Sequence, residues 1–447
     1  MATRVTETER KYEPTQAGRL AGVPGLEGGE ETVLDAVYHD TADLRLARRG
    51  VTLRRRTGGA DEGWHLKLPM GGDTREEIHA RDAKQKAAKR DADVKRVPEE
   101  LAELVRGMTR GEPLAPVAHV RTKRRRWELR DGEGRLAAEI VEDDVAAQTL
   151  GHTAVVKAWR EIEVELVEGG DEVFEAVERR LGKPSEVPSK LARVLGDRLP
   201  GKEKPAKGIT GHVRRQVAEM GRQDVRIRRD GEDAVHRMRV ASRRIRSVLQ
   251  AYKGNRRVIK ELRWLGAVLA PARDLEVLRE HLEAQVGELP SELVLGNVRQ
   301  RLTETFAPRE QRARAEVRRT LNSKRYFALL DRLDALEVRP AHKKRRLRKT
   351  ERRVWGRQTL HDVRKAAKRA RYAAEAAGKP KLARRMKKLQ KTLGVHQDSV
   401  VARQELRTMG VQSHLDGDNG FTYGLLYGCE LRRAERVEES LPRKRKV

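Results

Sequence analysis

Two rows of acidic side chains, far apart in the chain, have a spacing that could build a metal site. Glutamates alternate with other residues in the run Glu7–Lys11, which ends in a lysine, and again in the run Glu161–Glu165. Successive side chains of a β-strand point to opposite faces, so each row would share one face, as Glu139 and Asp143 would on another strand. Carboxylates crowded into one interior resist ionisation unless cations join them, and their oxygens suit Mg²⁺ or Mn²⁺. For either row alone, a solvent-facing sheet edge is the alternative.

Basic side chains in the same part of the chain follow the same alternation. They are Arg54 and Arg56, Lys67, Arg124 and Arg126, with Lys190 on a short helix. Interior acids and interior bases in a closed β-barrel describe a polar tunnel, in which cations grip phosphates and carboxylates hold the metal that polarises them. This half of the sequence therefore predicts phosphate chemistry.

A basic cluster occurs twice in the second half, at residues 235–246 and 360–371. Each copy reads H-x-x-R-x-x-x-[R/K]-R-x-R. At about 100° per residue on a helix, the histidine and the cations at i+3, i+7 and i+10 share one narrow stripe. A solvated helix face would normally carry acids among its bases, but these stripes carry none. The pattern favours an anion rich in phosphate oxygens, and the alternative is an exposed basic helix. The stripe residues are His236, Arg239, Arg243, Arg246, His361, Arg364, Lys368 and Arg371, flanked by Arg244 and Arg369.

The elements that must position these side chains differ between the halves. Apolar residues alternate from Val5 to about Leu166 and are separated by turn-like stretches, which predicts a mostly antiparallel β domain followed by short helices at Asp171–Leu181 and Lys190–Leu195. Beyond the linker, apolar spacings of three and four predict an all-α domain. The fold class is therefore α+β and multidomain.

The helical half looks duplicated. Leu265–Asp274 matches Leu389–Asp398, and each match follows its His-Arg cluster at nearly the same distance. Two such units predict two related helical bundles, with the basic stripes lining the space between them. We expect these boundaries: 1–199 for the β domain, 200–208 for the linker, 209–330 and 331–440 for the two helical repeats, and 441–447 for a basic tail.

Composition narrows the class of partner. Among 447 residues, 98 Lys and Arg against 68 Asp and Glu leave a net charge of +30, which implies a polyanionic partner. Aromatic residues make up only 4%, which counts against base stacking and so against nucleic acid as the main partner. The single cysteine, Cys429, excludes internal disulfides. No apolar stretch has the length of a signal or membrane helix, so we expect a cytoplasmic protein without membrane insertion.

Several motifs carry resemblances to known families. The run Glu7-x-Glu9-x-Lys11, with Tyr38-His39-Asp40-Thr41, Leu53-Arg54-x-Arg56, Lys67-Leu68-Pro69 and Glu161-x-Glu163-x-Glu165, resembles the CYTH family, also called triphosphate tunnel metalloenzymes. The motifs His236-x-x-Arg239 and His361-x-x-Arg364 resemble the CHAD domain, a duplicated helical module associated with polyphosphate binding. Together the resemblances cover nearly the whole chain.

The CYTH resemblance implies an eight-stranded tunnel with a defined set of site residues. Glu7, Glu9 and Lys11 would be catalytic, and Arg75 and Glu77 fit a further Arg-x-Glu position. Arg125 or Arg126 could replace Arg124 if the register slips by one. The implied metal ligands are Glu7, Glu9, Asp143, Glu163 and Glu165. The implied triphosphate-binding residues are Lys11, Arg54, Arg56, Lys67, Arg124 and Lys190. In the CHAD half, the stripe and flanking residues would bind polyphosphate.

The leading hypothesis is a Mg²⁺- or Mn²⁺-dependent triphosphatase that hydrolyses inorganic triphosphate or a related triphosphate. Its helical domain would bind inorganic polyphosphate, recruiting long chains or placing the protein on granules that contain them. One alternative is a catalytically silent polyphosphate scaffold. Others are an adenylate cyclase-like enzyme, since tunnel residues grip any triphosphate, and a nucleic-acid-binding protein.

Overall fold

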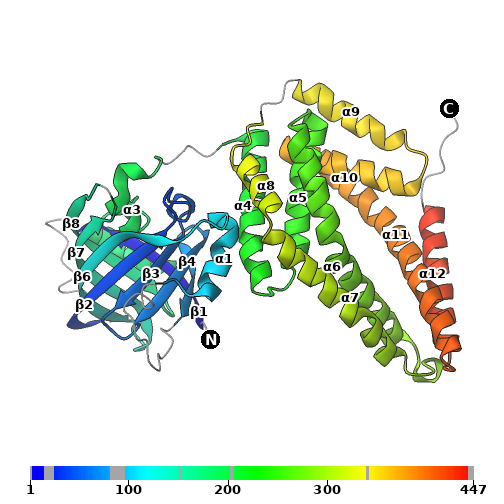
Figure 1. Cartoon of the computed structure of the whole chain (residues 1–447), viewed down its shortest axis with the longest axis horizontal. Coiled ribbons are helices and arrows are strands. Elements are labelled where there is room, and N and C mark those ends of the chain that lie inside the picture. The colour runs from blue at the N-terminus through cyan, green and yellow to red at the C-terminus, as the bar shows by residue number, and fades with distance from the viewer. Residues whose placement is uncertain are drawn as a thin grey trace. The chain divides into compact units, whose positions relative to one another are not determined.

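The computed structural model of the chain describes residues 3–14, 25–80, 96–151, 153–201, 206–338 and 342–440. The chain divides into two compact units, Met1–Glu203 and Lys204–Val447 (Figure 1). The basic segment 84–95 and the basic tail 441–447 lie outside the described residues. Each unit has its own packed core.

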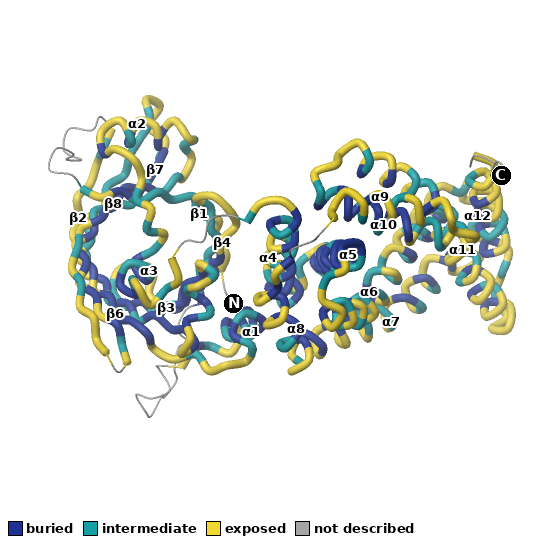
Figure 2. Tube along the Cα trace, turned by 90° about the horizontal axis from the view of Figure 1, so that it is seen from above, coloured by how far each residue is buried: buried dark blue, intermediate teal, exposed yellow. Residues whose placement is uncertain are grey.

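The first unit is a closed antiparallel barrel, which confirms the predicted architecture. Its strands run in the order β1-β5-β4-β3-β2-β6-β7-β8 around the barrel, and Figure 2 shows them as a ring. The strands are β1 (Thr3–Tyr12), β2 (Leu26–Asp40), β3 (Thr52–Thr57), β4 (Gly63–Gly71), β5 (Thr74–Ala80), β6 (Ala115–Arg130), β7 (Leu136–Thr149) and β8 (Val156–Leu166). Helix α1 (Glu99–Thr109) joins β5 to β6.

Alternation along the strands separates an apolar outer face from a charged inner one. Ile162 and Val164 of β8 pack with Phe174 of α2 (Asp171–Leu181), while the glutamates that alternate with them along β8 point the other way. Helix α2 and helix α3 (Lys190–Leu195) occupy the predicted positions. The outer face of the barrel thus packs against α2, and polar side chains point into the interior.

Helix α3 closes part of the barrel interior with apolar side chains. Leu191 and Val194 belong to one buried cluster with Val120 and Val145. Val120 lies on the same strand face as the inward Arg124, and Val145 lies on the same face as Asp143, because these positions differ by even numbers. Packing of α3 against this apolar end carries its first residue, Lys190, to the charged part of the interior.

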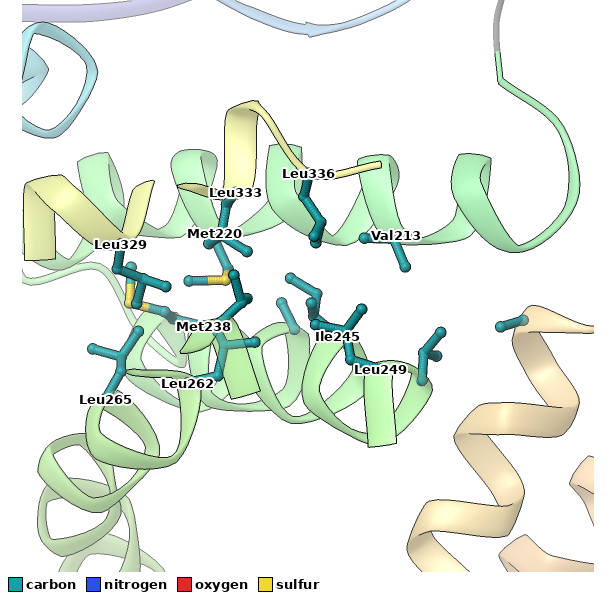
Figure 3. Packing of buried hydrophobic residues seen from close by; sticks show 14 of the residues in the cluster. Val213, Met220, Met238, Ile245, Leu249, Leu262, Leu265, Leu329, Leu333 and Leu336 are labelled. Atoms are coloured by element: carbon teal, nitrogen blue, oxygen red, sulfur yellow. The ribbon is translucent and has the colours of Figure 1, made fainter. Parts of the chain in front are cut away.

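The second unit is helical throughout its described residues, as the sequence predicts. Its helices are α4 (Gly208–Arg228), α5 (Ala234–Tyr252), α6 (Arg256–Glu288), α7 (Val298–Leu321), α8 (Lys324–Asp334), α9 (Lys343–Trp355), α10 (Leu360–Ala376), α11 (Pro380–Leu415) and α12 (Phe421–Ser440). Met220 of α4, Met238 of α5, Leu262 of α6 and Leu329 of α8 meet in its main core (Figure 3). This core holds α5 in a fixed rotation.

The two helices that carry the basic clusters pack against each other. The hydroxyl of Tyr252 at the end of α5 donates a hydrogen bond to the backbone oxygen of Ala373 in α10, at 3.1 Å. Each of the two is followed by a long helix, α6 after α5 and α11 after α10. A further core, which includes Leu282, Phe306 and Tyr423, joins α6, α7 and α12.

None of the described helices is long and apolar enough to cross a membrane.

Candidate functional site

Three carboxylates from two neighbouring strands meet inside the barrel. Asp143 of β7 and Glu161 and Glu163 of β8 each place one carboxylate oxygen within 4.8 Å of the others. Strand pairing explains the meeting, because Asp143 lies opposite Glu161, and Glu163 is two residues further along β8. Lys190 reaches all three, with its Nζ 2.8 Å from Asp143, 2.8 Å from Glu161 and 2.7 Å from Glu163.

Two further cations complete this carboxylate cluster. Arg124 donates from Nε and Nη2 to the two oxygens of Asp143, at 2.8 and 2.6 Å, and from Nη2 to Glu163 at 2.9 Å. Lys11 of β1 forms an ion pair with Glu163 and lies 3.4 Å from Glu161. The cluster of Asp143, Glu161 and Glu163 is thus surrounded by cations from three elements.

The charges of this cluster explain the acidities of its members. Burial alone would raise the carboxyl pKa values, but Lys190 and Lys11 lower the pKa of Glu161 to about 2. Lys190 and Arg124 likewise hold the pKa of Asp143 below its usual range against its burial. Burial lowers the pKa of Lys11 to about 8, although Glu9 and Glu161 oppose it. Near neutral pH the carboxylates of Asp143 and Glu161 are therefore ionised.

The donor set of the cluster fits a hard divalent cation. Three carboxylates offer only oxygen atoms, which are the ligands that Mg²⁺ and Mn²⁺ prefer, and the surrounding Lys and Arg side chains offer no competing soft ligand. Asp143, Glu161 and Glu163 are the residues that would hold such an ion.

A second group of charges lies along β1, β4 and β5. Lys67 Nζ is 2.5 Å from Glu7 and 3.4 Å from Glu77, and His65 Nδ1 is 2.7 Å from the other oxygen of Glu77. Burial, together with a hydrogen bond to Glu77, raises the pKa of Glu7 to about 8 against the pull of Lys67. Glu7 therefore holds a proton near neutral pH, whereas Glu77 is ionised, as Asp143 and Glu161 beside Lys190 are.

Glu9 and Glu165 connect the two groups electrostatically. Arg75 lies 3.4 Å from Glu9, and cations led by Lys11 and Lys67 overcome burial to lower the pKa of Glu9 to about 2. Burial raises the pKa of Glu165, although Lys67 opposes it and Glu9 adds to it. The pKa values of Glu9 and Glu165 therefore both depend on charged side chains of the barrel interior.

The predicted phosphate-binding arginines also lie at the inner face. Arg54 donates to the hydroxyl of Tyr38 at 3.3 Å, and Arg56 pairs with Asp61 at 3.1 Å. Burial, aided by Arg54 and Arg124, lowers the pKa of Arg56 to about 10. A phosphate chain in this interior would meet cations that repel one another.

The structure resolves the register of β6 and shows which of two neighbouring aspartates of β7 faces inward. Arg124 points inward to the carboxylates, whereas Arg125 and Arg126 are exposed and pair with Glu31 and Glu139. Asp143 is fully buried, and its neighbour Asp144 pairs with Arg160 on the outside.

The carboxylates that lie closest together share only Asp143 and Glu163 with the implied ligand set. Glu161 joins these two, while three residues that the resemblance implies as ligands are not part of that trio: Glu7, Glu9 and Glu165. The alternation of the run Glu161–Glu165 already placed all three glutamates on one face. His65 was assigned no role from the sequence. It lies two residues before Lys67 on β4, so strand alternation alone could have placed it on the same inner face.

In the helical unit the two stripes face a common region between α5 and α10. Burial lowers the pKa of Lys368 to about 7, and Arg364, Arg243 and Arg239 lower it further. Burial likewise lowers the pKa of Arg243, to which Arg239 and Arg364 add. Cations from both helices therefore lie close enough to repel one another.

Only a few acids reach these stripes. Arg239 donates to Asp274 of α6 at 2.6 and 3.3 Å, and Arg364 lies 3.6 Å from Asp398 of α11. Asp274 and Asp398 are the matching last residues of the two repeated segments. Both are well exposed, so they orient the arginines without neutralising the stripe.

The remaining stripe residues have polar neighbours on the same or adjoining helices. His361 Nδ1 lies 2.6 Å from Gln397, and Arg371 donates to Glu375 and Gln390. Burial lowers the pKa of His236, with Arg273 adding to it. Burial also lowers the pKa of Arg246, with Arg243 and Arg263 adding to it.

The flanking arginines differ in their surroundings. Arg244 lies 3.5 Å from Glu375. Burial lowers the pKa of Arg369, and Arg353, Arg357 and Arg263 add to it. These last three arginines were not singled out in the sequence, because they lie outside the repeated motif.

Comparisons with known proteins match both units. The CYTH domain model matches residues 6–193, and the CHAD domain model matches residues 211–407. The chain is a CYTH–CHAD protein. Two uncharacterized proteins of Mycobacterium tuberculosis, from two strains, are each 39% identical to it over 494 aligned residues, which cover 97% of this chain and 94% of the relative.

Solved structures resemble the CYTH–CHAD protein over about half its length. PptA from Streptomyces chartreusis aligns with 52% of this chain and 95% of its own, at 19% identity and a TM-score of 0.46. The CHAD domain from the plant Ricinus communis aligns with 52% of this chain and 91% of its own, at 21% identity and a TM-score of 0.40.

Proposed function

We propose that the barrel is a divalent-metal-dependent triphosphatase, which hydrolyses inorganic triphosphate or a related triphosphate. The observation that carries this proposal is the cluster of Asp143, Glu161 and Glu163, whose oxygens lie within 4.8 Å of one another. Membership of the CYTH family, also known as triphosphate tunnel metalloenzymes, supports the same reaction class. Mg²⁺ and Mn²⁺ are the metals whose ligand preferences agree with an all-oxygen donor set.

The side chains of the barrel divide the work of the reaction. A bound divalent ion would polarise phosphate oxygens and neutralise charge that develops on them. Arg54, Arg56 and Lys67 hold the phosphate chain in line. Glu7 is suited to give a proton to the leaving phosphate group, because its raised pKa of about 8 keeps it mostly protonated near neutral pH.

We propose that the helical unit binds inorganic polyphosphate along the two stripes and is built from two related repeats. The close approach of Arg243 and Lys368 supports an anionic ligand, since a phosphate chain would relieve their mutual repulsion. Such binding would bring long chains, or granules that contain them, to the protein.

The test is a crossed experiment on the full chain. Phosphate release from inorganic triphosphate, ATP, thiamine triphosphate and long-chain polyphosphate is measured with Mg²⁺, Mn²⁺ or chelator, beside polyphosphate binding. Replacing Glu7 and Glu9 together by alanine should abolish metal-dependent release and leave polyphosphate binding intact. Replacing His236 and Arg239 together by alanine should weaken polyphosphate binding and leave triphosphate cleavage intact.

The other outcomes contradict parts of the proposal. Polyphosphate binding without turnover on any substrate would make the protein a scaffold. Release of pyrophosphate and cyclic AMP from ATP would make the barrel a cyclase. Equal loss of both activities in either variant would refute the division of labour between the two units, and equal binding of DNA and polyphosphate would refute the proposed ligand of the stripes.

A further inference from the structure

A groove between α4 and α5 has no assigned role. Its volume is about 560 Å³, and four arginines line it, Arg215 and Arg222 from α4 and Arg237 and Arg244 from α5. His236 lines it as well. Its lining also includes the small apolar side chains of Ala218, Val240 and Ala241. The groove therefore combines a basic rim with a surface that a narrow chain could approach closely.

The arginines of this groove exceed its acids. Glu219 is the one acidic residue among the lining side chains, and it is held by Arg222 at 3.0 Å and by Gln223 at 2.8 Å. Within the described part of the chain, Arg215 and Arg237 form no ion pair with a carboxylate. Both are exposed, and their charges remain available to an anion.

A half-buried histidine beside the groove has a buried ring nitrogen without a partner. The Nε2 atom of His212 on α4 is buried and has no hydrogen-bond partner among the described residues. Burial lowers the pKa of His212, and Arg244 and Arg215 lower it further, although Glu375 opposes the shift. The ring therefore lies near two of the arginines of the groove. An acceptor oxygen there would satisfy the ring nitrogen when it carries a proton.

The groove adjoins the stripe of α5. Arg237, Val240 and Arg244 lie roughly 120° around the helix from Arg239 and its stripe neighbours. His236 lies between the two faces and lines the groove while belonging to the stripe. A ligand that follows the stripe could thus cross α5 at His236 and continue between α5 and α4.

We propose that the α4–α5 groove is a second anion site, which takes further phosphate groups of the same polyphosphate chain that lies along the stripe. This inference rests on the proposed polyphosphate binding and adds a path for longer chains. The groove suits phosphate groups rather than nucleobases, because none of its lining residues is aromatic and base stacking needs such rings. The stripe from His236 to Arg246 covers about 15 Å of helix, so a chain that fills the stripe must be longer than this to continue into the groove.

The experiment compares two double variants of the full chain that lose the same charge. One replaces Arg215 and Arg237 by alanine. The control replaces Arg256 and Arg257, which are exposed at the start of α6, do not line the groove and form no ion pair among the described residues. Affinity for long-chain inorganic polyphosphate and for chains too short to leave the stripe is measured over a range of salt concentrations.

The groove variant should bind long chains about tenfold more weakly and lose about one to two units from the slope of log affinity against log salt, since fewer cations contact phosphate. Its affinity for short chains and its triphosphate turnover should match those of the original protein. The control should keep its long-chain affinity to within about twofold.

Two results would overturn the inference. An equal loss in both double variants would assign the effect to net charge rather than to the groove. Unchanged long-chain affinity of the groove variant would also refute the second site. The proposed function would survive that result if the variant with His236→Ala and Arg239→Ala still bound polyphosphate more weakly. No polyphosphate binding by the original protein would instead refute the proposed function itself.

Discussion

The barrel interior and the α5–α10 region are both rich in cations, but they balance their charges differently. In the barrel, Lys190 alone reaches three carboxylates within 2.8 Å, so buried charges of both signs neutralise one another. Between α5 and α10, Lys368 has three arginines as its main electrostatic neighbours, and burial and these arginines lower its pKa to about 7. The buried charges of the barrel compensate one another without a ligand, whereas the cations between α5 and α10 have few matching acids among the described residues.

This difference in charge balance agrees with a catalytic role for the barrel interior and a binding role for the stripes of α5 and α10. Buried charges of opposite sign support each other, so removing one partner leaves another uncompensated. Clustered cations destabilise the fold, and only an anion relieves the cost. Substitutions in the barrel should therefore lower stability, whereas substitutions in the stripes should lower affinity and spare stability.

The largest effect should come from Lys190→Met. Its loss leaves Asp143, Glu161 and Glu163 close together without their shared cation, and we expect a decrease of about 3 kcal/mol in the free energy of unfolding of the barrel. Divalent metal should restore part of this stability if the three carboxylates bind it. Thermal melting with chelator, Mg²⁺ or Mn²⁺ measures both effects.

The control for Lys190→Met is Lys183→Met, which removes an exposed lysine of the same unit. It should change the melting temperature little under every condition. A destabilised Lys190→Met protein that gains nothing from Mg²⁺ or Mn²⁺ would contradict a metal site at the trio.

A smaller effect should appear in the pH dependence of polyphosphate binding. Burial and nearby arginines give Lys368 a pKa of about 7 in the free protein, and a bound phosphate chain would raise it. Binding then takes up a proton above pH 7, so affinity should fall severalfold as pH rises from 7 to 9. Titration of polyphosphate affinity against pH measures this.

Lys368→Arg is the matched variant for this pH dependence, because arginine stays charged throughout that range. Its affinity should change less between pH 7 and 9 than that of the original protein. Parallel curves for the two proteins would show that another group titrates.

The smallest effect should be a gain in stability from Lys368→Met. This variant removes a half-buried charge from a cluster of like charges and keeps most of the side-chain volume, so we expect unfolding to cost up to about 1 kcal/mol more. Denaturant titration in the absence of phosphate measures the change. A clear loss of stability would show that Lys368 is paired as the barrel lysines are, and the contrast between the two regions would fail.

Strand alternation predicted most of the barrel site. It separated Arg124 from Arg125 and Asp143 from Asp144, because a side chain's face depends only on whether its position in the strand is odd or even. It could not show which glutamate of the run Glu161–Glu165 meets Asp143. That depends on the stagger between β7 and β8, which is set by the closure of the whole barrel.

Helical spacing likewise predicted the two stripes, since the positions of residues on one helix face follow from the chain alone. The meeting of Arg243 with Lys368 required the packing of α5 on α10, and the pairing of Arg239 with Asp274 required α6. The sequence by itself determined the class of each element and the face of each side chain, because those are local properties. Only the tertiary structure decided which charges are compensated, because compensation depends on side chains brought together from distant elements.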